Sequence, residues 1–330
     1  MTIAIYLITI LTNSFYAIKK EKSKVLLLMS FILIVFLMGG AGPSYVSANH
    51  SGDYGRYVDL YKKSLTMGLF EDLQIGYISL MKLGHIFKLD FMVLRLIVIA
   101  ICYLLLYHFV IKKYSVNPHF IIIMYLIMPM IIDSEQFRNF IAMTILLIGI
   151  TQLQKDTLKS KGIFLLFVIL SASFHTVFLV YGLLIFATTK EKNTPALLIA
   201  GLALLVSAVA VLNGNEIPFL NSIVSPLFGD QRIVRYLTAK TNLGYIVPIL
   251  LQGMSIVLLF WSKKILQRTT TKNIEFEPGL TTEQPDFKLF GTLIQKDPEL
   301  IVKFTNLIFW VNILGVAFSL YLSFMFSFTV

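Results

Sequence analysis

The sequence has few charged residues and almost no cysteine, and both shortages narrow its class. Only 14% of its 330 residues are charged and 57% are hydrophobic, whereas about 25% of residues are charged in a typical soluble domain. The one cysteine, Cys102, lies in an apolar run. It excludes an intramolecular disulfide, and we expect it to pack as a small apolar side chain. The shortage of charge predicts an integral membrane protein.

Long apolar runs take the place of the missing charges. A helix needs about 20 mostly apolar residues to cross a hydrocarbon core of about 30 Å. The first run has no basic segment before it and no small-residue cleavage site, so we interpret it as a retained span. We expect an all-α, polytopic transmembrane helix bundle of about 9 to 10 spans, forming a single membrane domain over residues 1–330. The spans are predicted near residues 2–18, 24–40, 92–111, 118–132, 138–153, 162–187, 195–213, 244–262 and 302–328.

The net charge of +10 comes from lysines and arginines in short connectors between the apolar runs. This is the positive-inside pattern, so we interpret these connectors as cytoplasmic and expect no nucleic-acid partner. Residues 41–91, with an amphipathic helix near 72–90, and residues 213–243 then form outer loops. Residues 263–301 form a cytoplasmic connector.

The apolar run at 162–187 determines on which side of the membrane each later connector lies. A single crossing would place the basic cluster after residue 262 outside, against the positive-inside pattern. We favour a broken, re-entrant run that turns at its polar interruption, Ser171 to Thr176. Non-helical backbone is tolerated at that depth only where it is buried in protein or lines a water-filled cavity, so the break predicts a vestibule open to the outside.

Polar residues that could bind a ligand gather in the first predicted outer loop. Asp53, Tyr54, Arg56 and Tyr57 suit a glycan, because carboxylates accept hydrogen bonds from sugar hydroxyls and aromatic rings stack on sugar C–H faces. The alternative is an interfacial aromatic belt with ordinary solvated charges. Glu71 either stabilises the start of the amphipathic helix or contacts the same ligand.

Two residues within the predicted helices are costly unless they have partners. Arg138 lies at the start of a helix, where the dipole disfavours a cation, so it calls for an anion. Glu135 is one candidate partner, and a pyrophosphate gripped by the guanidinium fork is the other. His175 lies inside an apolar run, where an ionisable group indicates function unless it only hydrogen-bonds a neighbouring helix.

A second basic pair lies in the predicted outer loop at 213–243. Arg232 and Arg235, three residues apart, repel unless they share an anion, either an acidic lipid headgroup or a lipid pyrophosphate. Tyr236 follows them. We predict no metal site, because no Asp-x-Asp pair occurs near Glu71 and the histidines show no ligand spacing.

The order of these pieces resembles the EpsG family of polysaccharide polymerases, which are functionally akin to Wzy-type polymerases. The resemblance covers roughly residues 1–260, with Asn139 standing where the family usually has glutamine. The matching pieces are Asp53-Tyr54 with Tyr57 and Tyr61, Glu71 with Gly76-Tyr77, Arg138 to Ala142, and Ser173-Phe174-His175.

The resemblance implies a glycosyltransferase with a fold like those of membrane-embedded glycosyltransferases. It would polymerise capsular, exopolysaccharide or O-antigen repeat units on the outer face of the bacterial plasma (inner) membrane. The growing glycan would pass from undecaprenyl pyrophosphate to a sugar hydroxyl of another lipid-linked unit. Its partners would be the undecaprenyl-pyrophosphate-linked oligosaccharide and membrane lipids, with a flippase and a chain-length regulator beside it.

For that transfer we assign Asp53 or His175 to the attacking hydroxyl, and Arg138 with Arg232 and Arg235 to the departing pyrophosphate. Tyr54 and Tyr57 would bind sugar rings, and the remaining substrate contacts would come from Arg56, Glu71, Asn139 and Tyr236. Arginines can stabilise the leaving group as a metal does elsewhere, so we expect no cofactor. A flippase of the lipid-linked unit and a membrane O-acyltransferase with His175 as base remain alternatives.

The predicted topology can be tested by cysteine accessibility. A cysteine introduced at Thr189 or at Ser262 should react with a membrane-impermeant thiol reagent only after the cytoplasmic side is opened. Labelling of either position in intact cells would contradict the re-entrant run.

Overall fold

The computed structural model divides into two compact units, Met1–Leu179 with Asp286–Lys296, and Val180–Pro285 with Asp297–Val330. The residues it describes are 2–19, 21–40, 53–69, 74–115, 117–127, 129–186, 287–289, 292–294 and 298–317, with isolated positions between 198 and 261. The first unit carries every described residue of the candidate site. In the second unit, α15 covers Pro298–Ala317.

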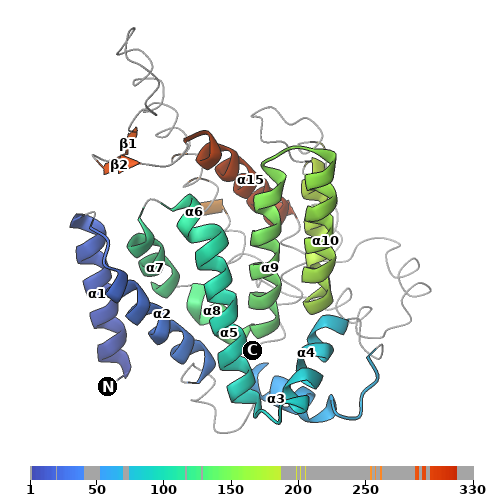
Figure 1. Cartoon of the computed structure of the whole chain (residues 1–330). Coiled ribbons are helices and arrows are strands. Elements are labelled where there is room, and N and C mark those ends of the chain that lie inside the picture. The colour runs from blue at the N-terminus through green and yellow to red at the C-terminus, as the bar shows by residue number, and fades with distance from the viewer. Residues whose placement is uncertain are drawn as a thin grey trace. The chain divides into compact units, whose positions relative to one another are not determined.

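Helices make up nearly all of the described part of the first unit (Figure 1). One short antiparallel hairpin is the exception, in which β1 (Phe287–Leu289) pairs with β2 (Thr292–Ile294). The helical fold class is thus as predicted, and the hairpin was not predicted. The helices are α1 (Thr2–Lys19), α2 (Lys24–Gly39), α3 (Asp53–Lys63), α4 (Ile75–Ile86), α5 (Phe91–Leu106), η2 (Tyr107–Ile111), α6 (Lys112–Tyr114), α7 (Pro118–Ile127), α8 (Pro129–Glu135), α9 (Phe137–Leu153), α10 (Leu158–Phe174) and the 3₁₀ helix η3 (Thr176–Phe186).

One helix in the described residues is long and apolar enough to cross a membrane. It runs through α5, η2 and α6 from Phe91 to Tyr114. Its 24 residues span roughly 36 Å at 1.5 Å per residue. Other predicted spans correspond to shorter apolar helices, among them α1, α2, α7 and α9. The predicted spans at 195–213 and 244–262 lie almost wholly outside the described residues.

Local sequence signals explain several helix ends. The Ser23 side chain accepts a hydrogen bond from the Leu26 N–H and caps α2. Thr157 and Ser160 form a capping box at the start of α10. Pro129 opens α8 and divides the predicted span 118–132 in two, because proline fits the first turn of a helix but not its interior.

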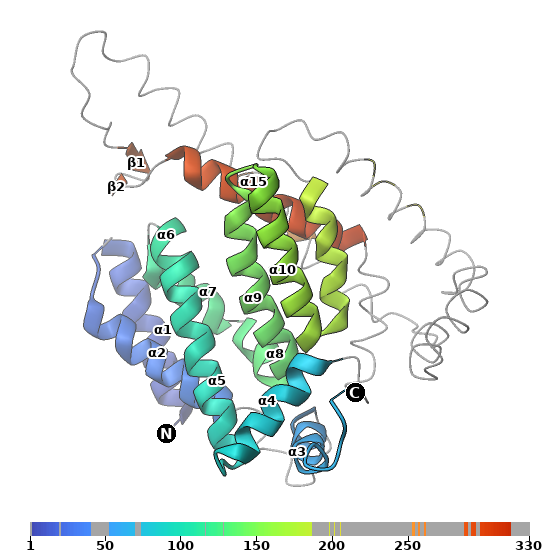
Figure 2. The same ribbon diagram turned by 45° about the vertical axis from the view of Figure 1, so that its right-hand side comes forward.

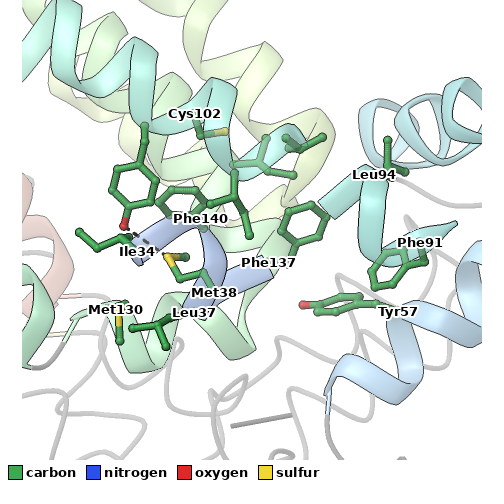
Figure 3. Close-up of a cluster of buried hydrophobic side chains, with 14 of the residues drawn as sticks. Ile34, Leu37, Met38, Tyr57, Phe91, Leu94, Cys102, Met130, Phe137 and Phe140 are labelled. Carbon is green, nitrogen blue, oxygen red and sulfur yellow. Dashed lines mark hydrogen bonds between the residues drawn. The ribbon is translucent and has the colours of Figure 1, made fainter. Parts of the chain in front are cut away.

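The core of the first unit joins α2, α3, α4 and α5 to the start of α9. Figure 3 shows Met38 on α2 close to Phe140 on α9, with Tyr57, Phe91 and Phe137 grouped beside them. α9 and α10 lie side by side in both views (Figure 1, Figure 2), and they pack closely at Gly149. A Cβ added to Gly149 would lie 2.6 Å from Phe167 Cβ.

This close packing predicts opposite effects for one substitution at two glycines. Gly149→Ala should lower the midpoint of thermal unfolding in detergent, because overpacking costs about 1 to 3 kcal/mol. Gly162→Ala on α10 is the matched control, since a Cβ there meets nothing within 4 Å. It should be neutral or stabilising, because alanine is favoured over glycine in a helix by about 1 kcal/mol. Equal midpoints for both variants would contradict the packing of α9 on α10.

Candidate functional site

Arg138 joins the start of α9 to Gln74, the residue directly before α4. Its Nη1 donates a hydrogen bond to Gln74 Oε1 at 2.5 Å. Its guanidinium carbon lies 5.3 Å from the centroid of the Tyr57 ring and 5.5 Å from that of the Tyr77 ring. A cation over aromatic faces is attracted by their quadrupoles. Arg138 therefore stands at the start of its helix, as predicted, with α3 and α4 supplying its surroundings.

A second guanidinium, that of Arg95, lies against the same aromatic group. Arg95 belongs to the first turns of α5 and is only 1% exposed. It donates a hydrogen bond to the Ser134 carbonyl oxygen. It also lies 5.2 Å from the Tyr54 ring and 5.7 Å from the Phe137 ring. Sequence reasoning missed Arg95, although a charged residue inside an apolar helix is itself a signal of function.

The aromatic rings between the two arginines form one continuous cluster. The Tyr57 ring lies 5.9 Å from the Tyr77 ring and 6.3 Å from the Phe137 ring, and the last two are 6.3 Å apart. Phe91 touches Phe137 at 6.2 Å. Figure 3 shows Tyr57, Phe91 and Phe137 gathered at one place. We call Tyr57, Tyr77 and Phe137 the aromatic cluster.

His175 follows directly after α10 and caps its end. The residue has extended backbone, with φ −151° and ψ 107°, and its N–H bonds to the Ser171 carbonyl at 3.1 Å. The predicted break of the run 162–187 is thus present at His175. The imidazole lies near enough to Arg138 for the two groups to interact electrostatically.

The end of α10 is held in place by contacts with α4 and α9. A Cβ on Gly76 would fall 2.2 Å from Ser173 Oγ, so only glycine lets the start of α4 approach α10 this closely. Ser171 Oγ donates to the Ala142 carbonyl on α9. Both views place α4 at the lower end of α10 (Figure 1, Figure 2). These contacts hold the end of α10, and with it His175, in electrostatic range of Arg138.

Three buried polar atoms in the described residues lack a hydrogen-bond partner: Tyr77 Oη, Arg95 Nε and His175 Nδ1. Tyr77 belongs to the aromatic cluster, Arg95 lies over its Phe137 ring, and His175 interacts electrostatically with Arg138. Buried polar atoms are nearly always paired, so an unpaired group calls for an explanation. Burial raises the pKa of Tyr77 well above its usual range, with Tyr57 acting in the same direction and both arginines opposing it. Its phenol is therefore neutral and can donate a hydrogen bond.

The charges around the cluster are mainly positive. Among the described acidic side chains, Glu135 at the end of α8 acts electrostatically on Arg95. No three His, Cys, Asp or Glu side chains in the described part of the chain could together hold a metal ion. The arrangement suits an anion that also carries hydrogen-bonding groups, because guanidinium groups bind phosphate or carboxylate oxygens.

The structure unites only some of the predicted site residues. It brings together Tyr54, Tyr57, Arg138 and His175, with Asn139 half-buried next to Arg138. Arg56 is exposed on α3. Asp53 is the first residue of α3, but its side chain is not described. The remaining predicted residues, Glu71, Arg232, Arg235 and Tyr236, lie outside the described residues.

Comparison with known proteins gives one result. The sequence model of the EpsG family matches residues 27–330. No curated protein and no solved structure matches the chain.

Because the Tyr77 hydroxyl has no described partner, replacing this tyrosine by phenylalanine should change stability less than the same replacement at Tyr61. Tyr77→Phe should leave the midpoint of thermal unfolding unchanged or raise it, because the hydroxyl it removes has no described partner. Tyr61→Phe is the matched comparison, since the Tyr61 hydroxyl donates to the Leu89 carbonyl at 2.5 Å. It should lower the free energy of unfolding by about 1 kcal/mol. A larger loss for Tyr77→Phe than for Tyr61→Phe would show that the Tyr77 hydroxyl is paired within the protein.

Proposed function

The chain belongs to the EpsG family, and on that premise we propose that it polymerises lipid-linked oligosaccharide repeat units. The observation that carries the proposal is the aromatic cluster with the guanidinium groups of Arg95 and Arg138 over its rings and with His175 in electrostatic range of Arg138. Transfer of a glycan from a lipid pyrophosphate needs cations for the leaving group and an acceptor for a hydroxyl proton. Both are present in this arrangement.

The reaction we propose is a single displacement at the anomeric carbon of the donor sugar. The acceptor hydroxyl oxygen forms the new glycosidic bond while the bond from the anomeric carbon to the pyrophosphate oxygen breaks. The hydroxyl proton passes to His175 Nδ1, which has no hydrogen-bond partner in the described residues. The departing undecaprenyl pyrophosphate keeps the bonding electrons, and Arg138 stabilises its charge. Asp53 remains the alternative acceptor of the proton.

The aromatic residues of α3 are proposed to bind the sugar rings. Tyr54 and Tyr57 lie on α3, within the segment predicted as an outer loop. The guanidinium group of Arg95 lies over the Tyr54 ring, and that of Arg138 lies over the Tyr57 ring. A sugar bound beside them would lie close to both cations. Binding two lipid-linked units in the right orientation would make a bimolecular reaction effectively unimolecular and so lower its barrier.

For the membrane, we propose a polytopic bundle in the bacterial plasma (inner) membrane with the site facing outward. Family membership and the long apolar helix from Phe91 to Tyr114 indicate a membrane protein. Exposed apolar side chains on the shorter helices support further spans, because such surface is stable in lipid but not in water. Examples are Leu11 and Phe15 on α1, and Leu28 and Ile32 on α2.

Loss of the Arg138 cation or of the His175 imidazole should block polymer formation. In cells carrying Arg138→Gln or His175→Ala, single lipid-linked repeat units should accumulate, with at least tenfold less long-chain polymer and unchanged protein level. Removal of one charge-assisted contact to a transition state costs about 3 kcal/mol, or about a hundredfold in rate. Lys62→Gln on the exposed side of α3 is the control and should make normal polymer. Normal polymer in both site variants would contradict the assignment.

Reconstituted liposomes should separate polymerisation from transport. The purified chain should lengthen glycans of lipid-linked units supplied on its own side, as seen by gel electrophoresis of the released glycans. If units cross the bilayer without being lengthened, the chain is a flippase and the proposal is wrong.

A further inference from the structure

Arg95 has no role in the transfer described above, although its guanidinium lies against the aromatic cluster. We propose that Arg95 binds the pyrophosphate of the lipid-linked substrate together with Arg138, and that the Tyr77 hydroxyl donates to the same group. This inference rests on the proposed function, because it names a further contact of the same site.

The burial of Arg95 is the first part of the argument. A charge that is 1% exposed is costly unless it is paired and its donors are satisfied. The Ser134 carbonyl accepts one of its hydrogen bonds, and Glu135 contributes one nearby negative charge. Its Nε–H has no acceptor among the described residues. The hydrogen bond to Ser134 therefore leaves one donor of a buried guanidinium group unsatisfied.

The position of Tyr77 is the second part. Its phenol is completely buried and is within electrostatic range of both Arg95 and Arg138. Its hydroxyl, too, has no partner in the described part of the chain. A neutral donor placed near two cations complements an anion with several oxygens. A pyrophosphate has such oxygens on both phosphorus atoms, so separate donors can reach it at once.

The charge balance is the third part. Arg95 and Arg138 bring two positive charges, and Glu135 is the described acidic side chain that acts on Arg95. The excess positive charge favours an anion over a neutral sugar. A neutral glycan would bring no negative charge to offset the two guanidinium groups.

The inference is tested by binding and kinetics on the purified full-length chain in detergent. The probe is inorganic pyrophosphate, with sodium chloride at matched ionic strength as the blank. Pyrophosphate should raise the midpoint of thermal unfolding of the unmodified protein. In Arg95→Lys, which keeps a cation able to donate to Ser134, pyrophosphate should bind at least tenfold more weakly, because ammonium lacks the guanidinium's fork of donors. Its KM for the lipid-linked donor should rise by a similar factor.

Two further variants make each outcome decisive. Tyr77→Phe should weaken pyrophosphate binding severalfold without loss of fold, so it replaces Arg95→Lys if the latter does not fold. Lys62→Gln should bind pyrophosphate as the unmodified protein does. If Arg138→Gln loses binding while Arg95→Lys and Tyr77→Phe keep it, the inference is wrong and the proposed function stands. If none of the three loses binding and Arg138→Gln still makes polymer, the proposed function is wrong as well.

Discussion

The burial of guanidinium groups among aromatic rings is the constraint on which the rest of the site depends. Removing an arginine from water costs several kcal/mol. A contact with an aromatic face returns about 0.5 to 2 kcal/mol, and Arg95 and Arg138 each have two such contacts. Hydrogen bonds to Ser134 and Gln74 add to this. The desolvation cost and these favourable contacts are similar in size. The one buried guanidinium donor without a described partner, Arg95 Nε, therefore affects the stability of the site.

The same constraint explains why α3 and α4 pack where they do. In addition to the apolar side chains that they bury, each brings a tyrosine to a cation of the bundle. The Tyr57 and Tyr77 rings cover Arg138, while Tyr54 covers Arg95. The segment predicted as an outer loop is therefore bound to the helices by the site itself.

The sequence predicted the helices more accurately than the contacts between them. Apolar runs and the Ser171 to Thr176 interruption gave the helices and the break, because both are local signals. Arg138 and His175 stood out since each is costly where it lies. Arg95 was overlooked because it is one charge near the start of an otherwise apolar run, and its importance appears only when Tyr54 and Phe137 are seen beside it. The pairing of Arg138 with Gln74, 64 positions away, is likewise set by tertiary packing.

The end of α10 links the fold to the chemistry. The His175 N–H still makes the helical hydrogen bond to the carbonyl four residues earlier, that of Ser171, but its backbone is extended, so α10 ends there. At this position the imidazole interacts electrostatically with Arg138. Gly76 makes this arrangement specific, because any larger residue would push α4 away from Ser173 and take Gln74 and Tyr77 with it. One close contact between two helix ends thus positions the end of α10 relative to Gln74 and Tyr77, the two residues of this segment that contact Arg138.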